Sequence, residues 1–262
     1  MTDTQERLRV TILGSGTSSG VPVIGCQCAT CLSGDPRDKR MRTSVMIECG
    51  DTRIIIDTSN DFRMQMLAHG VRKVDAIVFT HHHFDHISGF DDIRALNYVT
   101  RKPMDCYATE ETFKNLKKFF AYAFEGNTPA SGLPQTVLHL VQPGATFPVA
   151  GIEMTAIPLR HGSLDVMGYR VGNIAYCTDC NAIPESSYAL MEGLEYFIID
   201  ALRYTKHPTH FTVDEAIAVA QRVKAKQTYF THIAHEIKHE EAEKKLPQGM
   251  KIAFDGMTLE AA

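Results

Sequence analysis

Side chains that bind metals are densest in the segment Thr80-His81-His82-His83-Phe84-Asp85-His86. An apolar run, residues 74–79, precedes it and is typical of a buried strand. Side chains two residues apart at the end of an extended strand point the same way, so the first and third histidines should face one side. The aspartate and the last histidine follow on the turn that begins the next element. We expect four ligands here, which are His81, His83, Asp85 and His86.

One short cluster cannot complete two metal sites, so further ligands are expected at the ends of other predicted strands. Asp179 and His232 each directly follow such a run, and His161 lies two residues after the run that ends at Leu159. Taken singly, each is more often an ordinary polar residue, and only the joint pattern with the histidine segment makes them candidate ligands. Imidazole and carboxylate ligands suit zinc, manganese and iron about equally, so the sequence leaves the catalytic metal open.

Three of the seven cysteines crowd into Cys26-x-Cys28-x-x-Cys31, a spacing too tight for an ordinary disulfide framework. Structural zinc needs a closed tetrahedral set, for example three cysteines and one histidine. His235, three residues after His232, is the candidate fourth ligand, because one turn can send two such histidines to different sites. The alternative is a group of three buried free thiols.

Two other motifs resemble known sites but lack the context that those sites need. Cys177-Thr178-Asp179-Cys180 has the spacing of a redox pair, but it encloses a candidate metal ligand, and we interpret both cysteines as structural. Gly14-x-Gly16 with Gly20 misses the dinucleotide fingerprint by one residue and favours a backbone turn beside the metals.

The elements that must position these side chains are mostly strands with helices between them. The expected strands are residues 8–13, 43–49, 53–57, 74–79, 152–159, 166–171, 174–178, 196–200 and 228–231. The expected helices are residues 64–70, 110–126 and 212–226. The second helix carries many aromatic residues and precedes a loop at residues 127–134. This segment is expected to form a lid over the site, a homodimer interface or part of the core.

Composition bounds the class of protein. The chain has 262 residues, of which 44% are hydrophobic and 22% charged, which are values of a globular protein. No stretch approaches the ~20 apolar residues of a membrane span. The polar N-terminus indicates no signal or transit peptide, so the expected location is the cytoplasm. The net charge of −4 disfavours stable nucleic-acid binding, which needs a basic face.

The motif H-x-H-x-D-H after an apolar strand, with three later ligands at strand ends, resembles the metallo-β-lactamase superfamily over residues 8–257. The resemblance implies an α/β fold of four layers (αββα), in which two mixed sheets are sandwiched between helices, and a single hydrolase domain over residues 1–262. It also implies two catalytic metal ions. His81, His83 and His161 would bind the first ion and Asp85, His86 and His232 the second. Asp179 would bridge both ions, and a hydroxide shared between them would be the nucleophile.

The cysteine cluster, His235 and the segment Phe254-Asp255-Gly256-Met257 are similar to the phosphoribosyl cyclic phosphate phosphodiesterase family of the carbon–phosphorus lyase pathway. In that family the matching cluster holds structural zinc. By the same resemblance His210, which precedes a capping box at Thr212-x-x-Glu215, is the catalytic histidine that binds no metal. Asp200 would orient it, and the alternative is a surface histidine without a role. The predicted catalytic residues are His210, Asp200 and Asp85.

The leading expectation is therefore a metal-dependent hydrolase of a small phosphodiester, including a cyclic one. A tRNA 3'-processing endonuclease is a related alternative, although the chain has no long basic arm. Thioester or lactam hydrolysis on the same fold is another, for which a catalytic acid at His210 is less expected. A metal-binding module without activity is a minor alternative. Fold alone does not fix the substrate.

Overall fold

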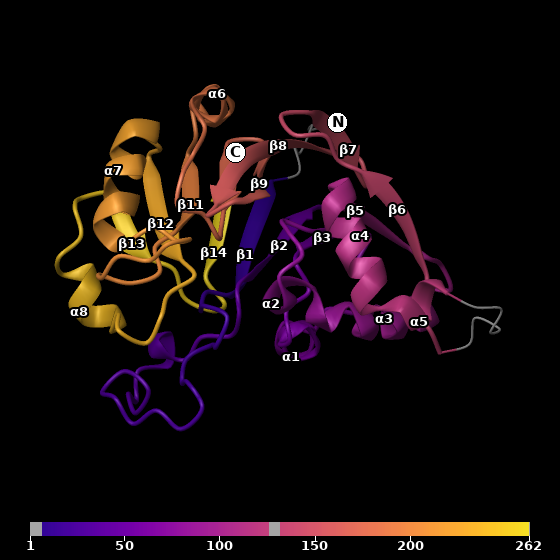
Figure 1. Ribbon diagram of the computed structural model, residues 1–262, viewed down its shortest axis with the longest axis horizontal. Helices are drawn as coiled ribbons and strands as arrows, with labels where there is room; N and C mark the ends of the chain where they lie inside the picture. Colours follow the sequence, from indigo (N-terminus) through magenta and orange to yellow (C-terminus); the bar gives the residue numbers. More distant parts are fainter. Residues whose placement is uncertain (1–6, 126–131, 262) are drawn as a thin grey trace, which may run out of the picture.

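The computed structural model describes residues 7–125 and 132–261 of the chain. Two mixed sheets, each of seven strands in this part of the chain, lie face to face, and helices cover their outer faces (Figure 1). The expected four-layer αββα arrangement is confirmed. Two predictions fall partly outside the described residues. The expectation about a leader peptide rests on residues 1–6, and the predicted lid segment includes residues 126–131.

The first sheet is built from the N-terminal half of the chain and its last strand. Its strands β1 to β3 pair antiparallel, whereas β3 to β6 run parallel. In spatial order the strands are β14 (Thr258–Ala261), β1 (Leu8–Gly14), β2 (Ser44–Cys49), β3 (Thr52–Ile56), β4 (Ala76–Val78), β5 (Met104–Ala108) and β6 (Thr136–Leu140). The helices of this half are α1 (Phe62–Ala68), α2 (Phe84–Ile87), α3 (Ile93–Thr100), α4 (Glu110–Phe119) and α5 (Ala121–Phe124).

The second sheet is built from the C-terminal half. Its strands β10 to β13 run parallel, and β7 to β10 pair antiparallel. In spatial order they are β13 (Met250–Ile252), β12 (Gln227–Thr231), β11 (Tyr196–Asp200), β10 (Ile174–Cys177), β9 (Leu164–Val171), β8 (Ile152–His161) and β7 (Thr146–Val149). The helices here are α6 (Glu185–Tyr188), α7 (Val213–Val223) and α8 (His239–Glu243). Short 3-10 helices are at Pro36–Asp38, Ser88–Asp92 and Ala189–Met191.

Strand β4 shows why the apolar run before the histidine segment is continuous. Successive side chains of a strand point to opposite faces of its sheet. Ala76 and Val78 pack in the core between the two sheets, whereas Ile77 and Phe79 pack against the helices on the outer face. Both faces of this strand are therefore buried, which requires apolar residues at every position.

The side chains predicted to bind metal lie where strands end. Parallel strands β3 and β4 deliver the chain to Asp57 and to the histidine segment, and parallel strands β10, β11 and β12 deliver it to Asp179, Asp200 and His232. The carboxyl ends of neighbouring parallel strands meet at one edge of a sheet, which is where open α/β folds place their sites. The two sheets thus bring distant parts of the sequence to one edge of the sandwich.

The predicted elements differ from the structure mainly at their ends. The hairpin of β2 and β3 is confirmed, and α7 begins with the predicted capping box between Thr212 and Glu215. This helix ends three residues earlier than predicted because Lys224 adopts a left-handed conformation. Helix α1 begins two residues earlier than predicted, at Phe62.

The predicted helix over residues 110–126 is not continuous, since Phe120, with φ −113°, separates α4 from α5. Of its aromatic residues, Phe113 and Phe120 are buried in the core under the first sheet. Phe119 and Tyr122 are about half exposed, and the Phe119 ring lies 6.0 Å from the ring of Phe84. The segment is therefore core on one face and open surface on the other.

None of the helices within residues 7–125 and 132–261 is both long and apolar enough to cross a membrane.

Candidate metal centre

The first group of candidate ligands joins the histidine segment to the second sheet. His81 and His83 follow β4, His161 is the last residue of β8, and Asp179 follows β10. One nitrogen or oxygen atom from each of these four residues lies within 4.8 Å of the others. The centroid of the His83 ring lies 4.5 Å from that of the His81 ring and 4.9 Å from that of the His161 ring. The structure therefore brings together the residues predicted for the first metal ion.

The second group consists of Asp85, His86, Asp179 and His232, and its donor atoms also lie within 4.8 Å of one another. Nε2 of His86 is 3.2 Å from Oδ1 of Asp179, and Nε2 of His232 is 3.3 Å from Oδ2 of the same carboxylate. Asp179 belongs to both groups, as expected of a bridging ligand. Its φ of 51° and the φ of 61° at His232 lie in the left-handed region, a strain that surrounding contacts must hold.

The donor set fits divalent cations. Nε2 of His81, His86 and His232 are buried without a hydrogen-bond partner, and a buried polar atom of this kind is costly unless something satisfies it. The buried or half-buried carboxylates at the centre carry several negative charges. Among the ion pairs of the described residues, Asp57, Asp85, Asp179 and Asp200 pair with histidines only. Bound cations would neutralise these charges and engage the orphaned nitrogens.

Burial sets the protonation of most of these histidines. It lowers the pKa of His81, His83 and His161, so their imidazoles are neutral and their lone pairs are available to a metal. Burial alone would also lower the pKa of His86, but the carboxylates of Asp179 and Asp85 raise it well above its ordinary value.

Asp57 is a residue of this site that the sequence analysis missed. Its fully buried carboxylate accepts a hydrogen bond from Nδ1 of His86 at 2.7 Å. It also accepts from Thr80, at 2.8 Å from the backbone nitrogen and 2.7 Å from Oγ1. A carboxylate that holds the second ring nitrogen of a metal-binding histidine orients the ring and raises its basicity. Asp57 directly follows β3, so the rule that found the other strand-end residues applies to it as well.

The predicted pair of Asp200 and His210 stands beside both groups. Nδ1 of His210 donates to Oδ2 of Asp200 at 2.8 Å, and the same oxygen accepts from the backbone nitrogen of Cys180 at 3.0 Å. The His210 ring lies 4.6 Å from the ring of His161 and 4.6 Å from that of His232. Burial would lower the pKa of His210, but the Asp200 carboxylate raises it to about 9. His210 is buried, which excludes the alternative of a surface histidine.

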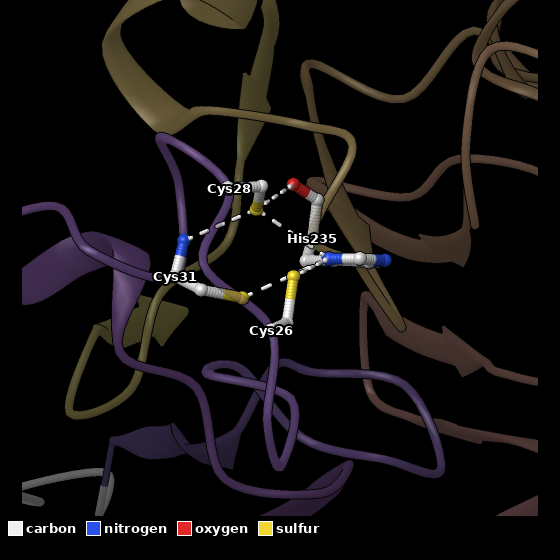
Figure 2. A group of neighbouring side chains, drawn as sticks. All are labelled: Cys26, Cys28, Cys31 and His235. Carbon is white, nitrogen blue, oxygen red and sulfur yellow. Dashed lines mark hydrogen bonds between the residues drawn. The ribbon is translucent and has the colours of Figure 1, made fainter.

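The three cysteines and His235 also come together, from loops that are far apart in the sequence (Figure 2). Nδ1 of His235 lies 3.2, 3.5 and 3.7 Å from the sulfurs of Cys26, Cys28 and Cys31. A tetrahedral zinc ion, with bonds of about 2.3 Å to sulfur and about 2.0 Å to nitrogen, holds sulfur and nitrogen about 3.5 Å apart. The cluster therefore has the dimensions of a closed structural zinc site.

The remaining motifs have structural surroundings. Cys177 and Cys180 are buried, and burial raises the pKa of both thiols, which disfavours a reactive thiolate. Gly14 ends β1 in close contact with Arg42, where an added Cβ would lie 2.0 Å from the Arg42 carbonyl oxygen. Gly16 forms bridges to Arg42 and Ile233, next to His232, so this loop does lie beside the candidate ligands.

Comparison with known proteins agrees with this geometry. Residues 52–233 match the family model of the beta-lactamase superfamily domain. A solved structure described as a new diphosphatase from the PhnP family is 43% identical, covers 97% of each chain and superposes with a TM-score of 0.91.

Curated relatives are matched over part of their length. An octanoyltransferase of Porphyromonas gingivalis is 35% identical over 95% of this chain and 51% of its own length. A ribonuclease Z of a Bradyrhizobium species is 24% identical over 51% of this chain and 45% of its own length. The chain thus spans about half the length of the curated relatives it matches. From the family match, the shared fold and the ligand groups, we conclude that the chain belongs to the metallo-β-lactamase superfamily of metal-dependent hydrolases and is similar to its PhnP family.

Proposed function

We propose that the protein is a metal-dependent phosphodiesterase that acts on a small phosphodiester, including a cyclic one. The observation that carries this proposal is the pair of His210 and Asp200 beside the candidate ligands. The His210 ring touches one histidine of each ligand group, at 4.6 Å in both cases. Expelling an alkoxide from a phosphodiester is easier when a positioned group protonates the leaving oxygen. Hydrolysis of a thioester on the same fold has less need of such an acid, because a thiolate departs readily without a proton.

The proposed ligand assignment follows the two groups described above. His81, His83 and His161 would hold one divalent ion, Asp85, His86 and His232 the other, and Asp179 both. Zinc or manganese, and equally iron, are ions that imidazole and carboxylate ligands of this kind bind. When bound, two such ions supply an activated water as the nucleophile and a clamp for the substrate oxygens.

Asp200 determines how His210 would act. Because Nδ1 of His210 is taken by the Asp200 carboxylate, only Nε2 is left to hand a proton to the leaving oxygen. The 2.8 Å bond to this fully buried carboxylate holds the ring of His210 in one orientation. Donor atoms of Asp200, His210 and His232 also lie within 4.8 Å of one another, so these residues could in principle hold a metal ion. The 2.8 Å hydrogen bond between Nδ1 of His210 and Asp200 favours instead a role for His210 as an acid.

We further propose that Cys26, Cys28, Cys31 and His235 bind one structural zinc ion. The distances between sulfur and nitrogen support it, and so do two bonds to sulfur from the backbone. The nitrogen of Cys31 donates to the sulfur of Cys28, and the nitrogen of Val23 donates to the sulfur of Cys31, each at 3.4 Å. The ion would tie the N-terminal loop to the loop that carries His232.

Two related activities are supported by the comparisons. The 43% identical structure is described as a diphosphatase, which favours a diphosphate bond as the second candidate substrate. The ribonuclease Z relatives favour cleavage of tRNA, although the net charge of −4 argues against a large RNA.

We propose that residues 1–262 act as one hydrolase domain in the cytoplasm. A homodimer through Phe119 and Tyr122 is one arrangement, which a monomer in light scattering would rule out.

A parallel screen of metal-loaded protein tests the proposed function. The substrates are bis-nitrophenyl phosphate, a cyclic ribosyl phosphate, a nucleoside diphosphate, a precursor tRNA, a glutathione thioester and a β-lactam. We expect turnover of the first two to exceed that of the others. Hydrolysis of the thioester or lactam without any phosphodiesterase activity would overturn the proposal. Turnover of the diphosphate alone, or of the tRNA alone, would also overturn it and would identify that compound as the substrate.

A further inference from the structure

His232 is held differently from the other buried candidate histidines. Nδ1 of His86 donates to Asp57 at 2.7 Å, and Nδ1 of His161 donates to the Thr209 carbonyl at 2.7 Å. Nδ1 of His81 lies 3.0 Å from Oγ1 of Thr80. In contrast, neither ring nitrogen of His232 has a hydrogen-bond partner among the described residues, and Nδ1 is 3.7 Å from Oδ1 of Asp200. No hydrogen bond to the ring fixes its orientation there; the ring stacks on that of His210, with centroids 4.6 Å apart, and its place otherwise depends on the backbone.

The backbone at His232 is strained and is held from outside. Its φ of 61° is unfavourable for a residue with a side chain. The next residue, Ile233, donates from its nitrogen to the Ser15 carbonyl at 2.9 Å and accepts from the Thr17 nitrogen at 3.2 Å. On the other side, the Thr231 carbonyl accepts from the Ala201 nitrogen at 3.0 Å. The N-terminal loop is therefore one of the two segments whose hydrogen bonds fix this turn, and the segment at Ala201 is the other.

The N-terminal loop is itself held at Ser15 by the carboxylate of Asp255, which lies 240 residues further along the chain. Oδ1 of Asp255 accepts from the Ser15 nitrogen at 2.9 Å and from Ser15 Oγ at 2.7 Å, and Oδ2 accepts from the Met41 nitrogen at 2.6 Å. Nη1 of Arg40 donates to the same Ser15 Oγ at 2.8 Å and to the Ala253 carbonyl at 2.5 Å. Ser15 has no exposed surface, so these bonds are shielded from water.

We propose that Asp255, acting through Ser15, is the positioning residue of His232 and so sets the affinity of the second metal site. The inference rests on the proposed role of His232 as a ligand. Metal-binding histidines are commonly oriented by a hydrogen bond to the ring, and loss of that bond typically weakens metal affinity about 10- to 100-fold. At His232 the series of hydrogen bonds from Asp255 to Ser15 and from Ser15 to Ile233 orients the histidine through the backbone instead.

The test compares Asp255→Asn and Ser15→Ala with wild type and with Asp75→Asn. The amide of Asp255→Asn presents a donor to backbone nitrogens that need an acceptor, whereas Ser15→Ala removes only the hydroxyl. Asp75 is a matched control, since its carboxylate also accepts from a backbone nitrogen, that of Arg53 at 3.0 Å, and it precedes β4 at the end away from the ligands. A chelator removes the catalytic metals, and Co²⁺ binding is then measured by calorimetry and by absorption of the bound ion.

We expect Asp255→Asn to weaken the second Co²⁺ site about 10- to 100-fold and to leave the first site unchanged. Ser15→Ala should have a smaller effect of the same kind, and Asp75→Asn none. A lower melting temperature with wild-type Co²⁺ affinity in both variants would show a merely structural role and overturn the inference. If Asp255→Asn fails to fold, Ser15→Ala decides by the same criterion.

His232→Ala separates this inference from the proposed function. Loss of one Co²⁺ ion in that variant supports the ligand assignment, and the positioning of His232 is then judged on the other variants. Unchanged Co²⁺ stoichiometry in His232→Ala would refute the ligand assignment itself and with it the inference.

Discussion

Nδ1 of His86 donates a hydrogen bond of 2.7 Å to Oδ2 of Asp57, and both side chains are buried. The carboxylate lies behind the ring, on the side away from the nitrogen that is available to a metal. It therefore fixes the orientation of a candidate ligand without itself belonging to either ligand group.

Asp57→Asn should weaken metal binding at the second site about 10- to 100-fold, since the neutral amide orients the ring less firmly and makes it less basic. Asparagine tolerates the left-handed φ of 66° at this position, so the backbone should keep its conformation. The metal concentration needed for half-maximal activity measures the effect. Asp105→Asn is the control, because Asp105 forms a 2.7 Å pair with His139 at the surface. Equal metal requirements in wild type and both variants would contradict this role.

Asp179→Asn and His83→Ala should each abolish hydrolysis while the fold is largely kept, because the core strands do not depend on these side chains. Metal content should fall with activity. Elemental analysis of purified protein, together with circular dichroism, checks the two parts of the prediction. Full activity with unaltered metal content would remove these residues from the ligand set.

Cys28→Ser should lower the melting temperature and remove about one zinc ion per chain, since binding of a structural ion contributes directly to folding. The control is Cys106→Ser, in which a buried thiol that belongs to none of the ligand groups is replaced. That variant should also lower the melting temperature but keep its zinc. Unchanged zinc content in Cys28→Ser would refute the structural site.

Much of the site could be predicted because its ligands obey a local rule. His81, Asp179 and His232 each follow an apolar run, and the run, its end and the polar residue are all visible within a few positions. The same holds for the cysteine spacing and for the capping box of α7. Asp57 obeyed the rule too but was passed over, because nothing in its own neighbourhood resembles a ligand motif.

Elements that depend on distant contacts could not be predicted in this way. Strand β5 alternates buried and half-buried residues, and β6 is a partly exposed edge strand, so neither has the continuous apolar run of β4. Helix α3 and strands β7, β13 and β14 were not predicted either. The link between Ser15 and Asp255 joins residues 240 positions apart, and only the fold brings them together.

The leaving-group dependence of His210→Ala tests the phosphodiesterase account most directly. This variant should keep both catalytic metals and lose about 10²- to 10⁴-fold in rate, the range of general acid catalysis. A nitrophenolate departs readily without a proton, whereas a sugar alkoxide does not. The two rate ratios, variant to wild type, are measured on metal-replete protein with an aryl phosphodiester and a ribosyl cyclic phosphate. The account predicts a much larger loss for the ribosyl ester. Equal losses would contradict the acid role, and no loss at all would remove His210 from the site.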